Sequence, residues 1–122
     1  MDIVAGNSYT LSFWARAGGP VLNGAEYRIE WLNAAGGFVG GQFDLNQAIQ
    51  SQLTSEYRQF SLTATAPAEA VRANVVFAIQ TFLTDGVNND TTVYWDDVSL
   101  VPAPGAAALL GLGGMLLARR RR

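Results

Sequence analysis

The stretch Ser8-Tyr-Thr-Leu-Ser-Phe-Trp-Ala-Arg-Ala17 decides the fold class. Its odd-numbered positions from Tyr9 to Ala15 are apolar, whereas its even-numbered positions from Thr10 to Arg16 are mostly polar. Because successive side chains of a strand point to opposite faces, a period of two residues predicts a half-buried β-strand.

The same period recurs in runs that are separated by glycine, asparagine, aspartate and proline, which are typical turn residues. We expect strands at 8–17, 25–33, 38–43, 57–66, 71–81 and 92–100. Helix is scarce, because only 45–53 has a pattern that suits a helical turn or two, and we expect a loop there. The sequence therefore predicts an all-β, antiparallel sandwich.

Charge is distributed unevenly along the 122 residues. Residues 1–100 contain four arginines and ten acidic residues, a net charge of −6, and four further arginines end the chain at 119–122. An acidic body argues against nucleic-acid binding, which depends on a basic face. The chain has no cysteine and no histidine, which excludes disulfides, Cys/His zinc sites and imidazole bases.

A three-part tail follows the body. Val101, Pro102, Ala103 and Pro104 precede an uncharged run over 105–118, and the arginine cluster closes the chain. As a helix the run would be about 21 Å long, against about 30 Å for the hydrocarbon core of a membrane, so it is a marginal permanent anchor. The positive-inside rule places the arginines in the cytoplasm and the body outside.

This order of parts resembles the PEP-CTERM sorting signal of exported bacterial proteins. The matching elements are Val101, Pro102, Ala103 and Pro104, the run 105–118, and Arg119, Arg120, Arg121 and Arg122. The resemblance implies transient insertion of 105–118 into the inner membrane, processing by an exosortase-type enzyme near the prolines, and release to the cell surface or medium. The usual glutamate between the prolines is Ala103 here, which points to a variant enzyme. A plain C-terminal anchor is the alternative.

The body resembles the family 4/9-like carbohydrate-binding modules, which have a galactose-binding-like jelly-roll fold. The resemblance rests on four segments, at 4–16, at 27–31 with Gly36-Gly37 following, at 57–67 and at 93–100. It implies a jelly-roll domain over 1–100, followed by the sorting tail over 101–122. Jelly rolls have about eight strands, so we expect the first strands, and a signal peptide, to lie upstream of Met1.

Asp96 and Asp97 are the most informative acidic pair. If Val98 and Leu100 face the core, alternation turns Asp96 inward and places Asp97 with Trp95 on the other face. The family resemblance implies that Asp96 helps to hold a structural calcium in the full-length domain, with a companion glutamate in the missing N-terminal segment. Calcium takes six to eight oxygens, and one carboxylate with backbone carbonyls supplies too few. Capping of nearby backbone amides by Asp96 is the alternative.

Exposed aromatic side chains are the candidates for ligand binding, because a sugar ring stacks on a flat aromatic face. Trp14 lies on the polar side of its strand, and Trp95 shares a face with Asp97, so either is a candidate platform for polysaccharide. Tyr27 and Trp31 lie on the same side as Ile29, and we expect them in the core.

Enzymatic activity is not expected. A glycosidase needs two carboxyls that converge on one bond, whereas adjacent strand residues such as Asp96 and Asp97 diverge. Glu26 and Glu30 alternate with apolar residues, and we expect them on a solvated face. The sequence thus favours a non-catalytic exported domain with a role in the envelope, matrix or adhesion. The alternative is a carbohydrate-binding module that recognises extracellular polysaccharide.

Overall fold

The computed structural model describes residues 2–80 and 90–103; residues 1, 81–89 and 104–122 lie outside this description. The described part contains β-strands and no helix. The strands are β1 (Ser8–Ala17), β2 (Gly24–Leu32), β3 (Phe38–Gly40), β4 (Gln47–Ala48), β5 (Arg58–Thr65), β6 (Arg72–Gln80) and β7 (Val93–Pro102).

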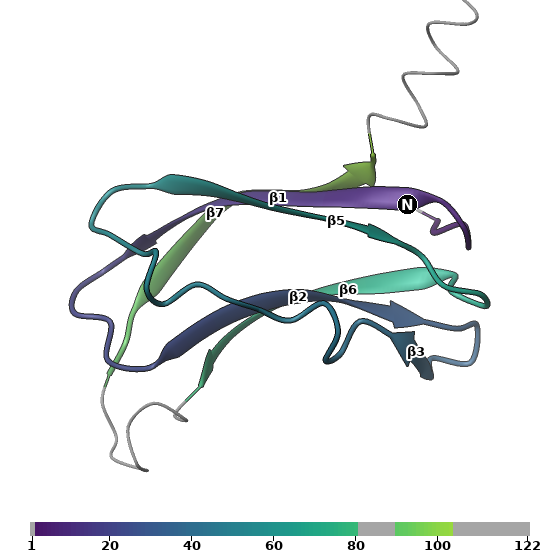
Figure 1. Cartoon of the computed structure of the whole chain (residues 1–122), viewed down its shortest axis with the longest axis horizontal. Helices are drawn as coiled ribbons and strands as arrows, with labels where there is room; N and C mark the ends of the chain where they lie inside the picture. Colours follow the sequence, from purple (N-terminus) through teal and green to yellow (C-terminus); the bar gives the residue numbers. More distant parts are fainter. Residues whose placement is uncertain (1, 81–89, 104–122) are drawn as a thin grey trace, which may run out of the picture.

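The strands form two antiparallel sheets that pack face to face (Figure 1). Sheet A has the order β5-β1-β7. In sheet B, β6 pairs with β2 over the whole length of that strand, so β3 and β4 share the other edge of β2. The prediction of an all-β, antiparallel sandwich is confirmed.

The core is built from alternate residues of the two central strands. Leu11, Phe13 and Ile29 are fully buried, which is the alternation that the sequence predicts for β1 and β2. The Phe13 ring lies at the centre of an aromatic cluster, 4.7 Å from the Tyr27 ring and 5.5 Å from the Phe60 ring between centroids. Each fully buried large apolar side chain contributes about 1.5–3 kcal/mol, so these alternating residues hold the two sheets together.

Two boundaries differ from the expectation. The segment 45–53 contains the short strand β4 and no helix. β7 continues beyond residue 100 and pairs Val101 with Thr10 and Pro102 with Tyr9. Proline is tolerated there because β7 is an edge strand of the described sheet, where the missing N–H leaves no ladder bond unmade. The first residues of the predicted sorting motif therefore belong to the sandwich.

The rest of the predicted tail, namely Pro104, the run 105–118 and the arginines 119–122, lies outside the described residues. Within the described residues, no helix is long and apolar enough to cross a membrane.

Candidate functional site

The outer face of sheet A, at one end of the sandwich, carries two rows of side chains from three neighbouring strands. In the first row Trp14 of β1 lies between Gln59 of β5 and Asp96 of β7. In the second row Arg16 lies between Tyr94, its partner in β7, and Tyr57, which precedes β5. We call this set the aromatic face: Trp14, Arg16, Tyr57, Gln59, Tyr94 and Asp96.

The three aromatic side chains of this face are accessible to a ligand. Trp14 is 39% exposed, Tyr57 43% and Tyr94 45%. The position of Trp14 is the one that alternation in β1 predicts. The sequence does not single out Tyr57 or Tyr94. Tyr57 lies at an outward-facing position of the predicted strand 57–66, whereas alternation counted back from Leu100 turns Tyr94 inward, and only the register of β7 against β1 turns it outward. Their pairing with the β1 row is set by the strand register and could not be read from either segment alone.

Arg16 joins the two tyrosines. The carbon of its guanidinium lies 4.3 Å from the centroid of the Tyr94 ring and 5.3 Å from that of Tyr57. Such cation–π contacts contribute about 0.5–1 kcal/mol each at exposed sites. The contacts favour a position of the guanidinium on the aromatic face, next to both rings.

A β-bulge in β7 reverses the expected orientation of Asp96 and Trp95. Ser12 pairs with Ser99 and Trp14 pairs with Asp96, so one residue of β1 lies opposite two residues of β7. The extra residue gives Asp97 a positive φ of 50°. Alternation counted back from Leu100 therefore fails at this point, and the expectation that Asp96 points inward is wrong.

Asp96 is exposed, and its Oδ1 accepts a hydrogen bond of 2.8 Å from the N–H of Asp97. This contact is the amide cap that the sequence left open as the alternative to calcium. Within residues 2–80 and 90–103 no three acidic side chains gather as a metal site would require. Calcium binding at Asp96 in a longer domain stays a prediction.

Trp95 points into the sandwich, contrary to the expectation that it shares a face with Asp97. Its ring centroid lies 4.4 Å from that of Phe77 and 5.5 Å from that of Phe13. The side chain is half-buried and packs against the core. Trp95 is therefore placed as a core residue at the β7 edge, whereas Trp14 lies on the aromatic face, and sugar contact by either remains a prediction.

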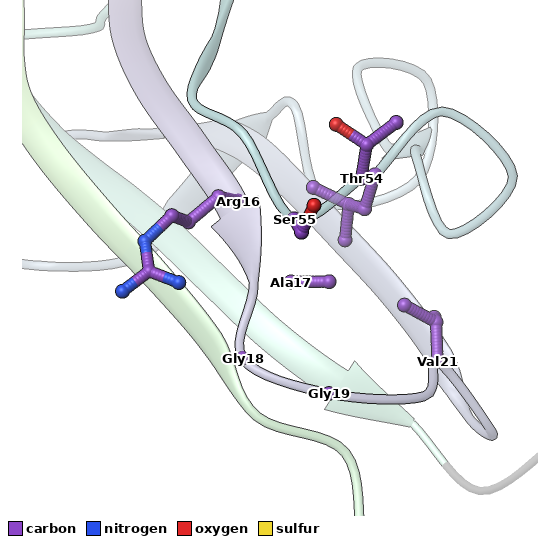
Figure 2. A pocket seen from close by; sticks show the side chains of 8 residues that line it. Arg16, Ala17, Gly18, Gly19, Val21, Thr54 and Ser55 are labelled. Carbon is purple, nitrogen blue, oxygen red and sulfur yellow. The ribbon is translucent and has the colours of Figure 1, made fainter.

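An open cavity of about 470 Å³ adjoins the aromatic face at the end of the sandwich. It lies between the segment after β1 and the segment before β5 (Figure 2). Its lining consists of Arg16, Ala17, Gly18, Gly19, Val21, Leu53, Thr54 and Ser55. Figure 2 shows the Arg16 side chain leaving β1 on the side away from Val21, so the guanidinium belongs to the aromatic face and the Arg16 stem to the cavity wall.

The outer face of sheet B contains a buried charge cluster, which corrects the expectation for Glu26 and Glu30. Glu26 and Glu30 are each only 6% exposed, and do not form a solvated face. The Arg28 side chain lies between them, with Nε 2.8 Å from an oxygen of Glu30 and Nη1 3.6 Å from an oxygen of Glu26. The amides of Asn46 and Gln80 also donate to Glu26, at 2.9 and 3.1 Å.

The chain after β3 accounts for part of this burial, because it runs along the edge of β2. At Gly41, which has a φ of 89°, an added Cβ would lie 2.0 Å from the carbonyl oxygen of Ile29. Only glycine allows that approach. The spacing Glu-x-Arg-x-Glu on one strand face was a signal for an ion-paired cluster, but nothing in β2 itself indicates that the face is covered.

Tyr27 and Trp31 lie in the core, as predicted, with 5% and 2% exposure. The Tyr27 hydroxyl donates to the carbonyl oxygen of Ser61 at 3.3 Å. Burial raises the pKa of Tyr27 above its ordinary value.

No protein-family model and no curated protein sequence matches the chain. Among solved structures it is similar to the enzymatically active domain of tailspike protein 4 from bacteriophage CBA120, with 17% identity and a TM-score of 0.64; the match covers 84% of this chain and 12% of that one. It is also similar to a CBM4, a family 4 carbohydrate-binding module, with 26% identity and a TM-score of 0.52 over 84% of this chain and 57% of the other. The chain thus spans only part of both structures, and it has a β-sandwich fold like that of a carbohydrate-binding module.

Proposed function

We propose that this domain binds an extracellular polysaccharide on the aromatic face and does not catalyse its breakdown. The observation that carries the proposal is the side-by-side exposure of Trp14, Tyr57 and Tyr94 on one sheet surface. Similarity to a CBM4 supports the same class of ligand.

The chemistry of the aromatic face suits a sugar. An exposed indole or phenol ring offers a flat apolar surface for the C–H groups of a pyranose ring. Gln59 and Asp96 flank Trp14 on its two neighbouring strands. Their amide and carboxylate groups are donors and acceptors for sugar hydroxyls, which is the usual combination in such sites.

The arrangement of carboxylates supports a binding role over a hydrolytic one. Glu26 and Glu30 are buried and both contact Arg28, so neither is presented as a free acid or nucleophile. Asp96 and Asp97 are consecutive in the chain, and Asp96 is engaged with the amide of its neighbour. A glycosidase requires two carboxyls that flank the scissile bond.

The export and sorting of the chain remain part of this proposal. The order of prolines, the apolar run 105–118 and the arginines 119–122 supports insertion into the inner membrane and processing by an exosortase-type enzyme. A polysaccharide-binding domain released to the surface or medium would contribute to the envelope, the matrix or adhesion. A structural calcium held in part by Asp96 is proposed on the family resemblance alone.

The test compares Trp14→Ala with Phe43→Ala by affinity electrophoresis on a panel of soluble polysaccharides. Phe43 is a matched control, because it is 89% exposed and lies outside the aromatic face. We expect Trp14→Ala to weaken binding by about tenfold or more, the loss of one stacked ring, and Phe43→Ala to leave it unchanged.

Urea denaturation of both variants confirms that each remains folded, and a reducing-end assay on each bound polysaccharide tests for hydrolysis. Binding that survives Trp14→Ala, or the absence of binding to every polysaccharide, contradicts the proposed site. Release of reducing ends by the wild-type chain contradicts the non-catalytic role.

A further inference from the structure

Arg16 and Arg58 differ from the two other arginines of the body in that their guanidinium groups contact aromatic rings. Of these two, Arg16 is the one on the aromatic face. Arg28 contacts two carboxylates, and Arg72 donates to the carbonyl oxygen of Ala34 at 3.0 Å. Within residues 2–80 and 90–103, the Arg16 side chain contacts the two tyrosine rings and makes no ion pair or hydrogen bond. Its N–H donors are therefore available to a ligand on the aromatic face.

The position of Arg16 relative to Trp14 suits one ligand. The two residues are two positions apart on the same face of β1, which is about 7 Å along a strand. A sugar ring that stacks on Trp14 thus has a guanidinium within reach of its substituents. Asp96, the carboxylate of the aromatic face, lies opposite Trp14 and forms no ion pair with Arg16.

Arginine in this setting is matched to a carboxylate. Its planar group presents parallel N–H donors that fit both oxygens of a carboxylate at once. The Tyr57 and Tyr94 contacts hold the guanidinium in place before a ligand arrives, which lowers the conformational entropy lost on binding. Residues 1–100 carry a net charge of −6, which repels a polyanion at long range. A preference for an acidic ligand would therefore depend on the local contact with Arg16.

We propose that the ligand is an acidic polysaccharide and that Arg16 binds the carboxylate of a uronic acid unit next to the ring stacked on Trp14. This inference rests on the proposed function, since it names the class of polysaccharide that the aromatic face takes. Tyr57 and Tyr94 act as positioning residues for the guanidinium.

The experiment measures binding of the full chain to polygalacturonate and alginate and to the carboxyl-reduced form of each, which keeps the polymer and removes its charge. The wild-type chain is expected to bind the acidic forms about tenfold more tightly than the reduced forms, as one charge-assisted contact allows. Arg16→Gln should abolish this preference, so that the variant binds the acidic and the reduced form of each polymer equally. Arg16→Lys, which keeps the charge without the planar fork, should retain only part of it.

Arg58→Gln is the matched control, because it removes the same charge from the other side of β5. Arg58 pairs with the buried Ala15, and its guanidinium lies 5.8 Å from the Phe60 ring. We expect the Arg58→Gln variant to keep the wild-type preference for the acidic polymers. Equal binding of acidic and reduced forms, or an equal effect of Arg58→Gln and Arg16→Gln, overturns the assignment of Arg16.

A stronger preference for dextran sulfate than for both uronates overturns the carboxylate assignment. If the wild-type chain binds the reduced polymers through Trp14 but shows no preference for the acidic forms, this inference is refuted and the proposed function stands. If the wild-type chain binds no polysaccharide at all, both this inference and the proposed function are refuted.

Discussion

Replacing Arg28 with methionine tests whether the cluster on the outer face of sheet B is a buried ionic network. The substitution keeps an unbranched side chain and removes the cation that contacts Glu26 and Glu30. Both carboxylate side chains are 8% exposed, so neither recovers its lost partner from bulk water without rearrangement. The expected result is a large loss of stability, because a buried charge is left without its counter-ion.

The size of the stability loss in Arg28→Met depends on the partners that remain for the two glutamates. Glu26 retains the amide donors of Asn46 and Gln80, whereas the described residues offer Glu30 no second side-chain donor. Breaking a buried pair costs about 3–5 kcal/mol. The Arg28 side chain is 21% exposed, which places the expected loss at the lower end, about 3 kcal/mol or roughly 15 °C in Tm for a domain of this size.

The assay is urea denaturation followed by tryptophan fluorescence, with two companion variants. The triple replacement Glu26→Gln, Arg28→Met, Glu30→Gln removes all three charges and should recover stability to within about 1 kcal/mol of the wild type. Arg72→Met removes an exposed arginine and should cost less than about 1 kcal/mol. A loss below about 1 kcal/mol for Arg28→Met, or a triple variant no more stable than the single one, refutes the reasoning.

Three further predictions follow from the described residues. Gly41→Ala should lower the free energy of unfolding by about 3 kcal/mol or more, because the added Cβ would collide with the backbone of β2. The control is Gly36→Ala, since Gly36 has a similar φ of 87° but no atom within 4 Å of an added Cβ. It should cost about 1 kcal/mol by urea denaturation. Burial raises the pKa of Tyr27, so the unfolded chain loses that proton first and stability should fall as pH rises above about 10; a Tyr27→Phe variant with an equally steep fall contradicts this. The intact mass of the processed protein should correspond to a C-terminus at or beyond Ala103, because the Ala103 N–H donates to the carbonyl oxygen of Ser8 at 2.9 Å. A C-terminus before Ala103 contradicts this prediction.

The bulge in β7 shows where periodicity stops being informative. A period of two assigns each side chain to a face only while the strand stays regular. Trp95, Asp96 and Asp97 are compatible with either register. Counting back from Leu100 selects the wrong one, because Asp97 and Val98 together lie opposite the single residue Phe13. Aspartate tolerates positive φ better than most residues, but the same residue type is common in ordinary turns and gives no specific warning.

The buried charges of β2 show a different limit. Glu26, Arg28 and Glu30 alternate with apolar residues in the pattern that is typical of a strand with one exposed face. Their burial depends on neighbours from β6 and from the segment that contains Asn46. Periodicity reports which side of a strand is polar, and it does not report what else in the chain covers that side.

The sequence by itself determined the all-β class, the inward residues of β1 and β2, and the outward position of Trp14, because all three depend on alternation within one continuous strand. Only the tertiary structure decided that Tyr57, Arg16 and Tyr94 form one row beside Trp14. These residues come from segments that are far apart in the chain, and they meet through the register between strands. Register depends on packing across both sheets and on a single inserted residue, so the candidate site exists only after the strands have paired.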